Sequence, residues 1–288
     1  MTLQQHAAAR SKSTSRTVSW AALPGQPTWV LLRGMSRESG HWGRFPQALG
    51  RFLQTAQPGS GMRMLDLPGM GERRGDTSPT RVSAIVDECR AQLAAAGVRG
   101  PVYLVGMSLG AMVATDWIAH HPAEVAGGVL INASVRPFSE RFRMVRPMSY
   151  VTLMLLSLSR FSARPREARV LRLTTRLVER EAVLDHWVAL ARERPLGVRN
   201  SFRQLYAAWR YRASRTRPGA PILLLCSKGD TLVDWRCSQA MSRAWGAPLR
   251  LHTQAGHDLP LDDPEWVAGA ITDWLAERQR HGLDSGFG

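Results

Sequence analysis

Apolar runs alternate with amphipathic stretches along most of this chain of 288 residues. Short apolar runs predict six strands, at residues 28–32, 62–67, 102–105, 125–132, 221–226 and 249–253. Helical periodicity predicts helices between them, at residues 41–53, 79–97 with Ser78 as N-cap, 111–121, 235–245 and 264–280. Such alternation is typical of an α/β protein with a mostly parallel, doubly wound sheet covered by helices on both faces.

One interruption divides this pattern, at residues 137–217, where the sequence predicts three or four helices. We therefore expect a core built from residues 18–136 and 218–288, a helical lid inserted at 137–217, and a disordered tail at 1–17. One lid helix after Pro165 is predicted to group its apolar side chains on one face, namely Val170, Leu171, Thr174, Leu177 and Val178. A second apolar stripe is predicted for Val198, Phe202, Leu205, Tyr206 and Trp209.

Composition restricts the class of protein. With 44% hydrophobic residues the chain can bury a large core, and its longest apolar stretch, residues 150–158, is too short to cross a bilayer. The start of the sequence lacks the apolar segment of a secretory signal, so we expect a cytoplasmic protein. The three cysteines form no CxxC pair, which predicts neither a disulfide framework nor a zinc site.

The net charge of +15 is concentrated in the predicted lid. Between residues 136 and 217 there are 19 arginines and 6 acidic residues. Five arginines recur at helical spacing on one predicted face: Arg166, Arg169, Arg172, Arg176 and Arg180. This face is either an ordinary solvated surface or a contact for an acidic acyl carrier, a phosphate-bearing carrier such as coenzyme A, or an anionic lipid surface. Nucleic acid is disfavoured, because Phe202, Tyr206 and Trp209 fall on the predicted apolar stripe.

The candidate chemistry lies in short segments that follow predicted strands. In residues 106–110, a serine, Ser108, stands between two glycines where a strand turns into a helix. A serine hydroxyl needs a base to remove its proton and an acid to orient that base. His257 follows the last predicted strand, and Asp230 follows the strand before it, with Asp234 as an alternative acid. We expect Asp258, Asp262 and Asp263 to cap the helix that comes next.

These segments resemble motifs of the α/β-hydrolase superfamily, of the type that carries an inserted helical cap. The matching motifs, which span about residues 28–275, are Asp66 to Gly71, Gly106 to Gly110, His121-Pro122, Gly229 to Val233 and Gly256-His257. The resemblance implies an α/β-hydrolase fold and the triad order Ser108, Asp230, His257. It also implies an oxyanion hole made by the backbone N–H groups of Leu109 and Met35. Relatives have His-Gly where this chain has Arg33-Gly34, which predicts a fixed positive charge beside the site.

We therefore expect a serine hydrolase that cleaves a small-molecule carboxylic ester or thioester through an acyl-enzyme, without a metal or organic cofactor. Two alternatives use the same triad: transfer of the acyl group to another acceptor, and cleavage of a carbon–carbon bond. A further alternative is a non-catalytic binding module whose basic lid contacts an acidic partner. The sequence leaves open the acyl group, its carrier and the oligomeric state.

Overall fold

The computed structural model describes residues 19–139 and 163–282. Six strands form one sheet in the order β2-β1-β3-β4-β5-β6, and every pair of neighbours is parallel. The strands are β1 (Thr28–Leu32), β2 (Gly61–Leu65), β3 (Val102–Met107), β4 (Val125–Ile131), β5 (Ile222–Ser227) and β6 (Leu249–His252). The predicted strands are confirmed, with ends that differ by at most two residues.

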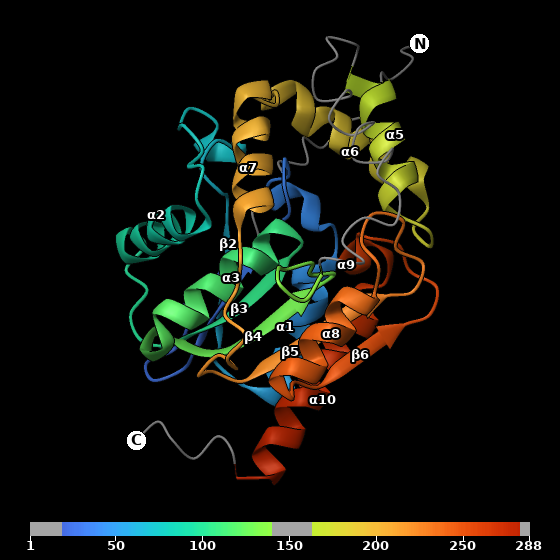
Figure 1. Cartoon of the computed structure of the whole chain (residues 1–288). Coiled ribbons are helices and arrows are strands. Elements are labelled where there is room, and N and C mark those ends of the chain that lie inside the picture. The colour runs from blue at the N-terminus through green and yellow to red at the C-terminus, as the bar shows by residue number, and fades with distance from the viewer. Residues whose placement is uncertain (1–18, 140–162, 283–288) are drawn as a thin grey trace, which may run out of the picture.

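Helices cover both faces of the sheet (Figure 1). The α-helices of the core are α1 (Phe45–Ala56), α2 (Val82–Ala95), α3 (Leu109–His120), α8 (Arg236–Trp245), α9 (Leu259–Asp262) and α10 (Pro264–Arg280). Among the described residues, three further helices lie between β4 and β5 in the sequence: α5 (Ala163–Thr174), α6 (Arg180–Glu193) and α7 (Val198–Arg210). The described residues also form short 3-10 turns: η1 (Ser39–Trp42), η2 (Gly71–Arg73) and η3 (Pro122–Glu124).

The two faces of the sheet build two separate cores because side chains alternate along each strand. In β1, Val30 and Leu32 pack in a cluster with α2, α3 and α8. Trp29 and Leu31, one residue away, pack in a second cluster with α1 and α10. All four side chains are fully buried, so both faces of this strand are apolar, as a doubly wound sheet requires.

The strand order reverses at β1, since the chain passes from β1 to β2 on one side and returns to β3 on the other. Loops that leave the carboxyl ends of β1 and β3 therefore diverge, and open α/β sheets bind their ligands at such a point. Figure 1 shows α5, α6 and α7 above the sheet, on the side toward which the strands point. The two ends of the segment between β4 and β5 meet there. Arg136 and Arg212 form an isolated parallel β-bridge, and the Arg136 carbonyl accepts a hydrogen bond from the Ala213 N–H at 2.8 Å.

Two predicted helix starts are wrong. Helix α2 begins at Val82 rather than at 79, because the Ser78 backbone is held by α7: its N–H donates to Asn200 Oδ1 at 3.0 Å, and its carbonyl accepts from Arg203. The predicted helix at 41–53 divides into η1 and α1, with Gly43 between them at φ 59°. An added Cβ at Gly43 would lie 2.7 Å from Leu261, so the chain turns where only glycine fits.

The single arginine-rich helix predicted after Pro165 is also wrong. Helix α5 ends at Thr174, and the chain bends before α6 starts at Arg180. The bend follows from tertiary contact: the Asp262 carboxylate accepts hydrogen bonds from three successive N–H groups of residues 176–178. Arg176 lies in this bend and Arg180 opens the next helix, so the five arginines do not share one face.

The aromatic side chains of the apolar stripe predicted on α7 are exposed, whereas Val198 and Leu205 are half-buried. Phe202, Tyr206 and Trp209 are 38%, 45% and 56% exposed, whereas Ser201 and Gln204 are buried. The polar side chains face inward because they bond to the core, as described below. Phe202, Tyr206 and Trp209 are therefore not hidden against the core, and their predicted position gives no reason to disfavour nucleic acid.

The packing predicts that Leu104→Ala in β3 destabilises the fold by about 2–5 kcal/mol, because the side chain is fully buried between β1 and β4. Urea unfolding of the variant and the wild type measures the difference. Leu23→Ala is the matched control, since Leu23 is 63% exposed, and it is expected to change stability by no more than about 0.5 kcal/mol. Equal effects at the two positions would contradict this description of the core.

Candidate active site

The Ser108 turn joins β3 directly to α3. Ser108 adopts φ 55° and ψ −113°, a strained conformation for a residue with a side chain. A Cβ at Gly106 would lie 2.3 Å from the Gly110 carbonyl oxygen, and a Cβ at Gly110 would lie 2.1 Å from the Leu32 carbonyl oxygen. Only glycines fit at these two positions, so the strand and the helix can approach closely enough to present the serine on a sharp turn.

The backbone N–H groups of Met35 and Leu109, the predicted oxyanion donors, have no acceptor within residues 19–139 and 163–282. Leu109 is the first residue of α3, where helical N–H groups lack partners and the helix dipole is positive. Met35 lies in the loop after β1, which sits against the serine, since a Cβ at Gly34 would lie 3.3 Å from Ser108 Cβ. The oxyanion hole itself stays a prediction.

His257 and Asp230 are brought together from the loops after β6 and β5. His257 Nδ1 lies 2.7 Å from Asp230 Oδ2, and the two side chains are 7% and 1% exposed. The other carboxylate oxygen of Asp230 accepts from the N–H groups of Leu232 at 2.7 Å and Val233 at 3.0 Å. The bond leaves His257 Nε2 as the nitrogen that can accept a proton. The alternative acid, Asp234, instead accepts from Arg236.

The electrostatic environment of His257 favours its protonated form. Burial alone would lower the pKa of this imidazole, but the Asp230 carboxylate outweighs burial through charge and hydrogen bonding. Asp258 adds to the increase and Arg33 opposes it, and the pKa is raised above 6.5. An imidazole with a raised pKa is a stronger base, provided that the pH is high enough to leave it neutral.

Ser108 and His257 line one cavity between the sheet and the inserted helices, with Asp230 behind His257. Within the described ranges no hydrogen bond joins the Ser108 hydroxyl to the imidazole. Helices α5, α6 and α7 supply much of the opposite wall, through residues such as Val170, Leu190 and Leu205. The structure therefore places the predicted serine and histidine in a shared space that a ligand can enter.

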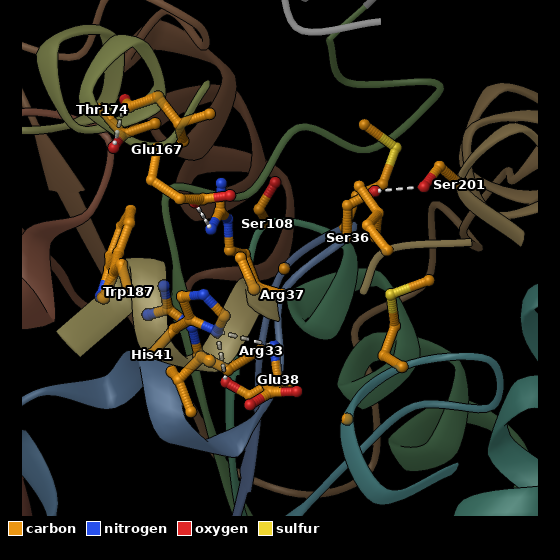
Figure 2. Close-up of a pocket in the computed structure, with 18 of the residues that line it drawn as sticks. Arg33, Ser36, Arg37, Glu38, His41, Ser108, Glu167, Thr174, Trp187 and Ser201 are labelled. Carbon is orange, nitrogen blue, oxygen red and sulfur yellow. Dashed lines mark hydrogen bonds and ion pairs between the residues drawn. The ribbon is translucent and has the colours of Figure 1, made fainter. Parts of the chain in front are cut away.

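Charged side chains form another part of this wall. Arg37 Nη1 donates to Glu167 Oε2 at 2.7 Å, and Arg166 Nε donates to Glu167 Oε1 at 3.0 Å. Burial would raise the pKa of Glu167, but the two guanidinium groups outweigh it and hold the pKa below 4.5. Figure 2 shows Ser108 between this pair and the hydrogen-bonded hydroxyls of Ser36 and Ser201, which are 3.0 Å apart.

Two other ionisable groups in the cavity are shifted toward neutrality. Burial raises the pKa of Glu38 to about 7, although Arg194, with its Nε 3.3 Å away, opposes this. Burial, together with the positive charges of Arg37 and Arg33, lowers the pKa of His41 well below 6.5. His41 is therefore a neutral ring near pH 7, and it packs edge-on against Trp187.

The loop after β1 is attached to three other parts of the molecule. Ser36 N–H donates to Gln204 Oε1 on α7 at 3.0 Å, which explains why that polar residue is buried. Arg37 binds Glu167 on α5. Arg33 forms two hydrogen bonds with the Asp258 carboxylate, at 3.0 and 2.7 Å, beside His257. The backbone of Met35 therefore lies in a loop whose position is set from several sides.

The Arg33 and Asp258 pair bears on two predictions. Arg33 lies beside the site, as predicted, but its charge is paired with the Asp258 carboxylate, which the sequence analysis did not foresee. Asp258 does not cap a helix through its side chain, whereas Asp263 caps α10 by accepting from Trp266 N–H. The only signal in the sequence is that each residue adjoins a motif and that their charges are opposite.

The five predicted arginines divide into three groups. Arg166 lines the cavity and binds Glu167, so it belongs to the site itself. Arg169 and Arg172 are exposed on α5 and bind no carboxylate within the described ranges. Arg176 and Arg180 lie beyond the end of α5, and Arg180 donates to the Thr175 carbonyl at 2.8 Å. A contact with an acidic partner stays a prediction, and Arg169 and Arg172 are the two of the five that share an exposed face of α5.

Within residues 19–139 and 163–282, no cluster of three or more His, Cys, Asp or Glu side chains could hold a metal ion. No helix in these ranges is long and apolar enough to cross a membrane. Cys89, Cys226 and Cys237 are buried and form no disulfide within these ranges, and burial raises the pKa of the Cys89 and Cys226 thiols to about 12. The apolar segment 150–158 lies outside the described residues.

Comparison with known proteins supports the same class. A family model described as "Alpha/beta hydrolase family" matches residues 15–270, so this chain belongs to the α/β-hydrolase family. A relative from Cronobacter turicensis, "Putative carbamate hydrolase RutD", is 28% identical over 263 residues, which cover 86% of this chain and 90% of the relative. Its homologue from Cronobacter sakazakii is 27% identical over 241 residues, which cover 79% of this chain and 82% of that relative.

Solved structures share the fold at lower identity. A thermophilic esterase from Thermogutta terrifontis has a TM-score of 0.67 and 18% identity, over 90% of this chain and 92% of the esterase. An esterase from Rhodococcus sp. ECU1013 has a TM-score of 0.65 and 20% identity, over 89% and 92% of the two chains. Family and relatives together identify the protein as a hydrolase with the α/β-hydrolase fold.

The His257 environment predicts a titration midpoint above 6.5, which falls in Asp230→Asn because the charge that stabilises the imidazolium is removed. NMR titration of the histidine ring protons measures both midpoints. Because the folded-state pKa is raised, the contribution of His257 to stability is fully present below pH 6.5 and is lost as the pH rises through the folded-state value. Asp234→Asn is the matched control and should leave the midpoint unchanged. A wild-type midpoint below 6.5 would show that Asp230 does not govern this histidine.

Proposed function

We propose that this hydrolase cleaves carboxylic esters or thioesters through a covalent acyl-enzyme, with Ser108 as nucleophile, His257 as general base and Asp230 as the orienting acid. One observation carries the proposal. His257 lines the same cavity as Ser108, which stands on a strained turn, and the buried Asp230 lies behind His257, with its Oδ2 2.7 Å from His257 Nδ1. A serine without these partners would be a weak nucleophile near neutral pH. The esterase fold of the solved structures is consistent with this chemistry.

In the first half-reaction, Ser108 Oγ attacks the carbonyl carbon while His257 Nε2 takes the hydroxyl proton. Asp230 holds the ring with Nδ1 as donor and stabilises the imidazolium that forms. The negative charge that develops on the carbonyl oxygen is stabilised by the N–H groups of Leu109 and Met35, which have no other acceptor among the described residues. The imidazolium then protonates the alkoxide or thiolate that leaves.

The second half-reaction repeats these steps with water. His257 removes a proton from the water, whose oxygen attacks the acyl carbon, and the same two N–H groups stabilise the second tetrahedral intermediate. Collapse of this intermediate releases the carboxylic acid and returns the proton to Ser108. Both half-reactions need neutral His257, so activity should rise with pH through its raised pKa.

Helices α5 to α7 form the proposed lid, and we assign the apolar part of the cavity to the acyl group. Support comes from the lining residues, which include Val170 on α5, Leu190 on α6 and Leu205 on α7. Met35 and Met70 line the same cavity from the core, and flexible thioether side chains adapt to acyl groups of different shape. The substrate is then a small acyl compound rather than a polymer.

A second candidate substrate is a carbamate. The relatives from two Cronobacter species carry the name carbamate hydrolase and align with most of this chain. A carbamate carbonyl would react with the same serine, histidine and oxyanion donors. The distinction between an ester and a carbamate therefore depends on the cavity walls, and it is decided by comparing kcat/KM for the two compounds.

The proposal predicts that Ser108→Ala lowers kcat by about 10⁴-fold or more, because attack on the carbonyl depends on this hydroxyl. The assay is hydrolysis of a panel of p-nitrophenyl esters, acyl thioesters and aryl carbamates by purified protein. Ser83→Ala is the control, since Ser83 is exposed on α2, and it should retain wild-type rates. A Ser108→Ala protein with activity within tenfold of the wild type would contradict the proposed nucleophile.

A further inference from the structure

We propose that Arg33 and Asp258 are a pair of positioning residues that hold the oxyanion loop, the nucleophile turn and the histidine loop in mutual register. The inference rests on the proposed function, which it deepens by naming residues outside the triad that the reaction needs. Neither residue is required to touch the substrate. Each adjoins a group that the proposed mechanism uses.

The geometry connects all three loops at one buried guanidinium. Arg33 comes directly before Gly34 and Met35, and its two terminal nitrogens reach the two Asp258 oxygens at 3.0 and 2.7 Å. Asp258 directly follows His257. Arg33 Nη1 also lies 3.4 Å from the sulfur of Met107, the residue before Ser108. One side chain thus contacts a neighbour of the nucleophile and a neighbour of the base while it carries the loop of the predicted oxyanion donor.

The pair is rigid as well as connected. The two side chains are only 2% and 3% exposed, and the Arg33 guanidinium stacks 4.8 Å above the centre of the Trp42 ring. A planar guanidinium that binds both oxygens of a carboxylate fixes distance and orientation together, which a single hydrogen bond does not do. Asp258 is held from the other side too, since its N–H donates to the Thr174 carbonyl at the end of α5, at 2.8 Å.

Stability alone is a poor reason for this arrangement. Two buried charges lose their hydration, and apolar residues of similar volume in their place often leave a protein equally or more stable. A pair retained for geometry differs from a pair that only compensates its own charges. The difference becomes measurable when both charges are removed at once.

The test compares the wild type with Arg33→Met, Asp258→Leu and the double variant Arg33→Met/Asp258→Leu. Each single variant leaves one buried charge unpaired and should unfold at a lower temperature, whereas the double variant should regain a near wild-type Tm. Despite that recovery, we expect the double variant to show kcat about 100-fold below the wild type, because small displacements of reacting groups cost this much. KM should change by less than about threefold, since Val170, Leu190 and Leu205, the cavity residues assigned to the acyl group, are unchanged. The second-order rate of labelling by a fluorophosphonate should fall in parallel with kcat.

Arg250→Met is the control. Arg250 lies on β6 and binds Glu277 on α10 rather than a group of the proposed mechanism, so its replacement should leave kcat unchanged. Arg33→Lys keeps the charge without the planar fork and should fall between the wild type and Arg33→Met. If Arg33→Met, Asp258→Leu and the double variant do not fold, the conservative variants Arg33→Lys and Asp258→Asn replace them. The labelling rate is then expected to fall by at least about tenfold.

A double variant with wild-type kcat would overturn the inference, as would unchanged labelling rates in the two conservative variants. The pair would then only compensate its own buried charge. Failure of the proposed function is distinguishable, because in that case the wild-type protein itself neither reacts with the fluorophosphonate at Ser108 nor hydrolyses the ester panel.

Discussion

The close approach of α3 to the ends of β1 and β3 is the constraint on which the site depends. Contact between Gly110 and the Leu32 carbonyl leaves no space for a side chain, and it forces Ser108 into a left-handed conformation. The same contact brings the positive end of α3 and the loop after β1 to one point, where the strand order reverses. Ser108, the start of α3 and the loop that carries Met35 therefore lie together at one cavity because of one packing arrangement.

The loops of the acid and the base are tied to the inserted helices by hydrogen bonds at the end of α5. Thr231, beside Asp230, donates to the Leu173 carbonyl at 2.9 Å, and Asp258, beside His257, donates its N–H to the Thr174 carbonyl. The Asp262 carboxylate accepts hydrogen bonds from N–H groups in the bend that follows α5. The helices above the cavity are therefore connected directly to the loops below it, so a change in one affects the position of the other.

The sequence predicted the strands well because the four central strands, β1, β3, β4 and β5, are buried on both faces, which produces apolar runs that local pattern detects. It failed where distant contacts override local pattern. Ser201 and Gln204 turn inward on α7 because they bond to the loop of Ser36, and the aromatic residues of that helix turn outward. The proximity of Asp230 to His257, and the cavity that Ser108 and His257 share, could be expected from the sequence because each residue follows a strand within a short motif. Arg33 and Asp258, which are 225 residues apart, carry no comparable signal.

Covalent labelling is the most direct test of whether Ser108 is an activated nucleophile. The protein is incubated with an alkyl fluorophosphonate, digested, and analysed by mass spectrometry, with His257→Ala in parallel. If His257 activates Ser108, we expect one phosphonyl group per chain on the peptide that contains Ser108, and much slower labelling of His257→Ala. Labelling at another residue, or none on Ser108 in folded wild-type protein, would contradict it.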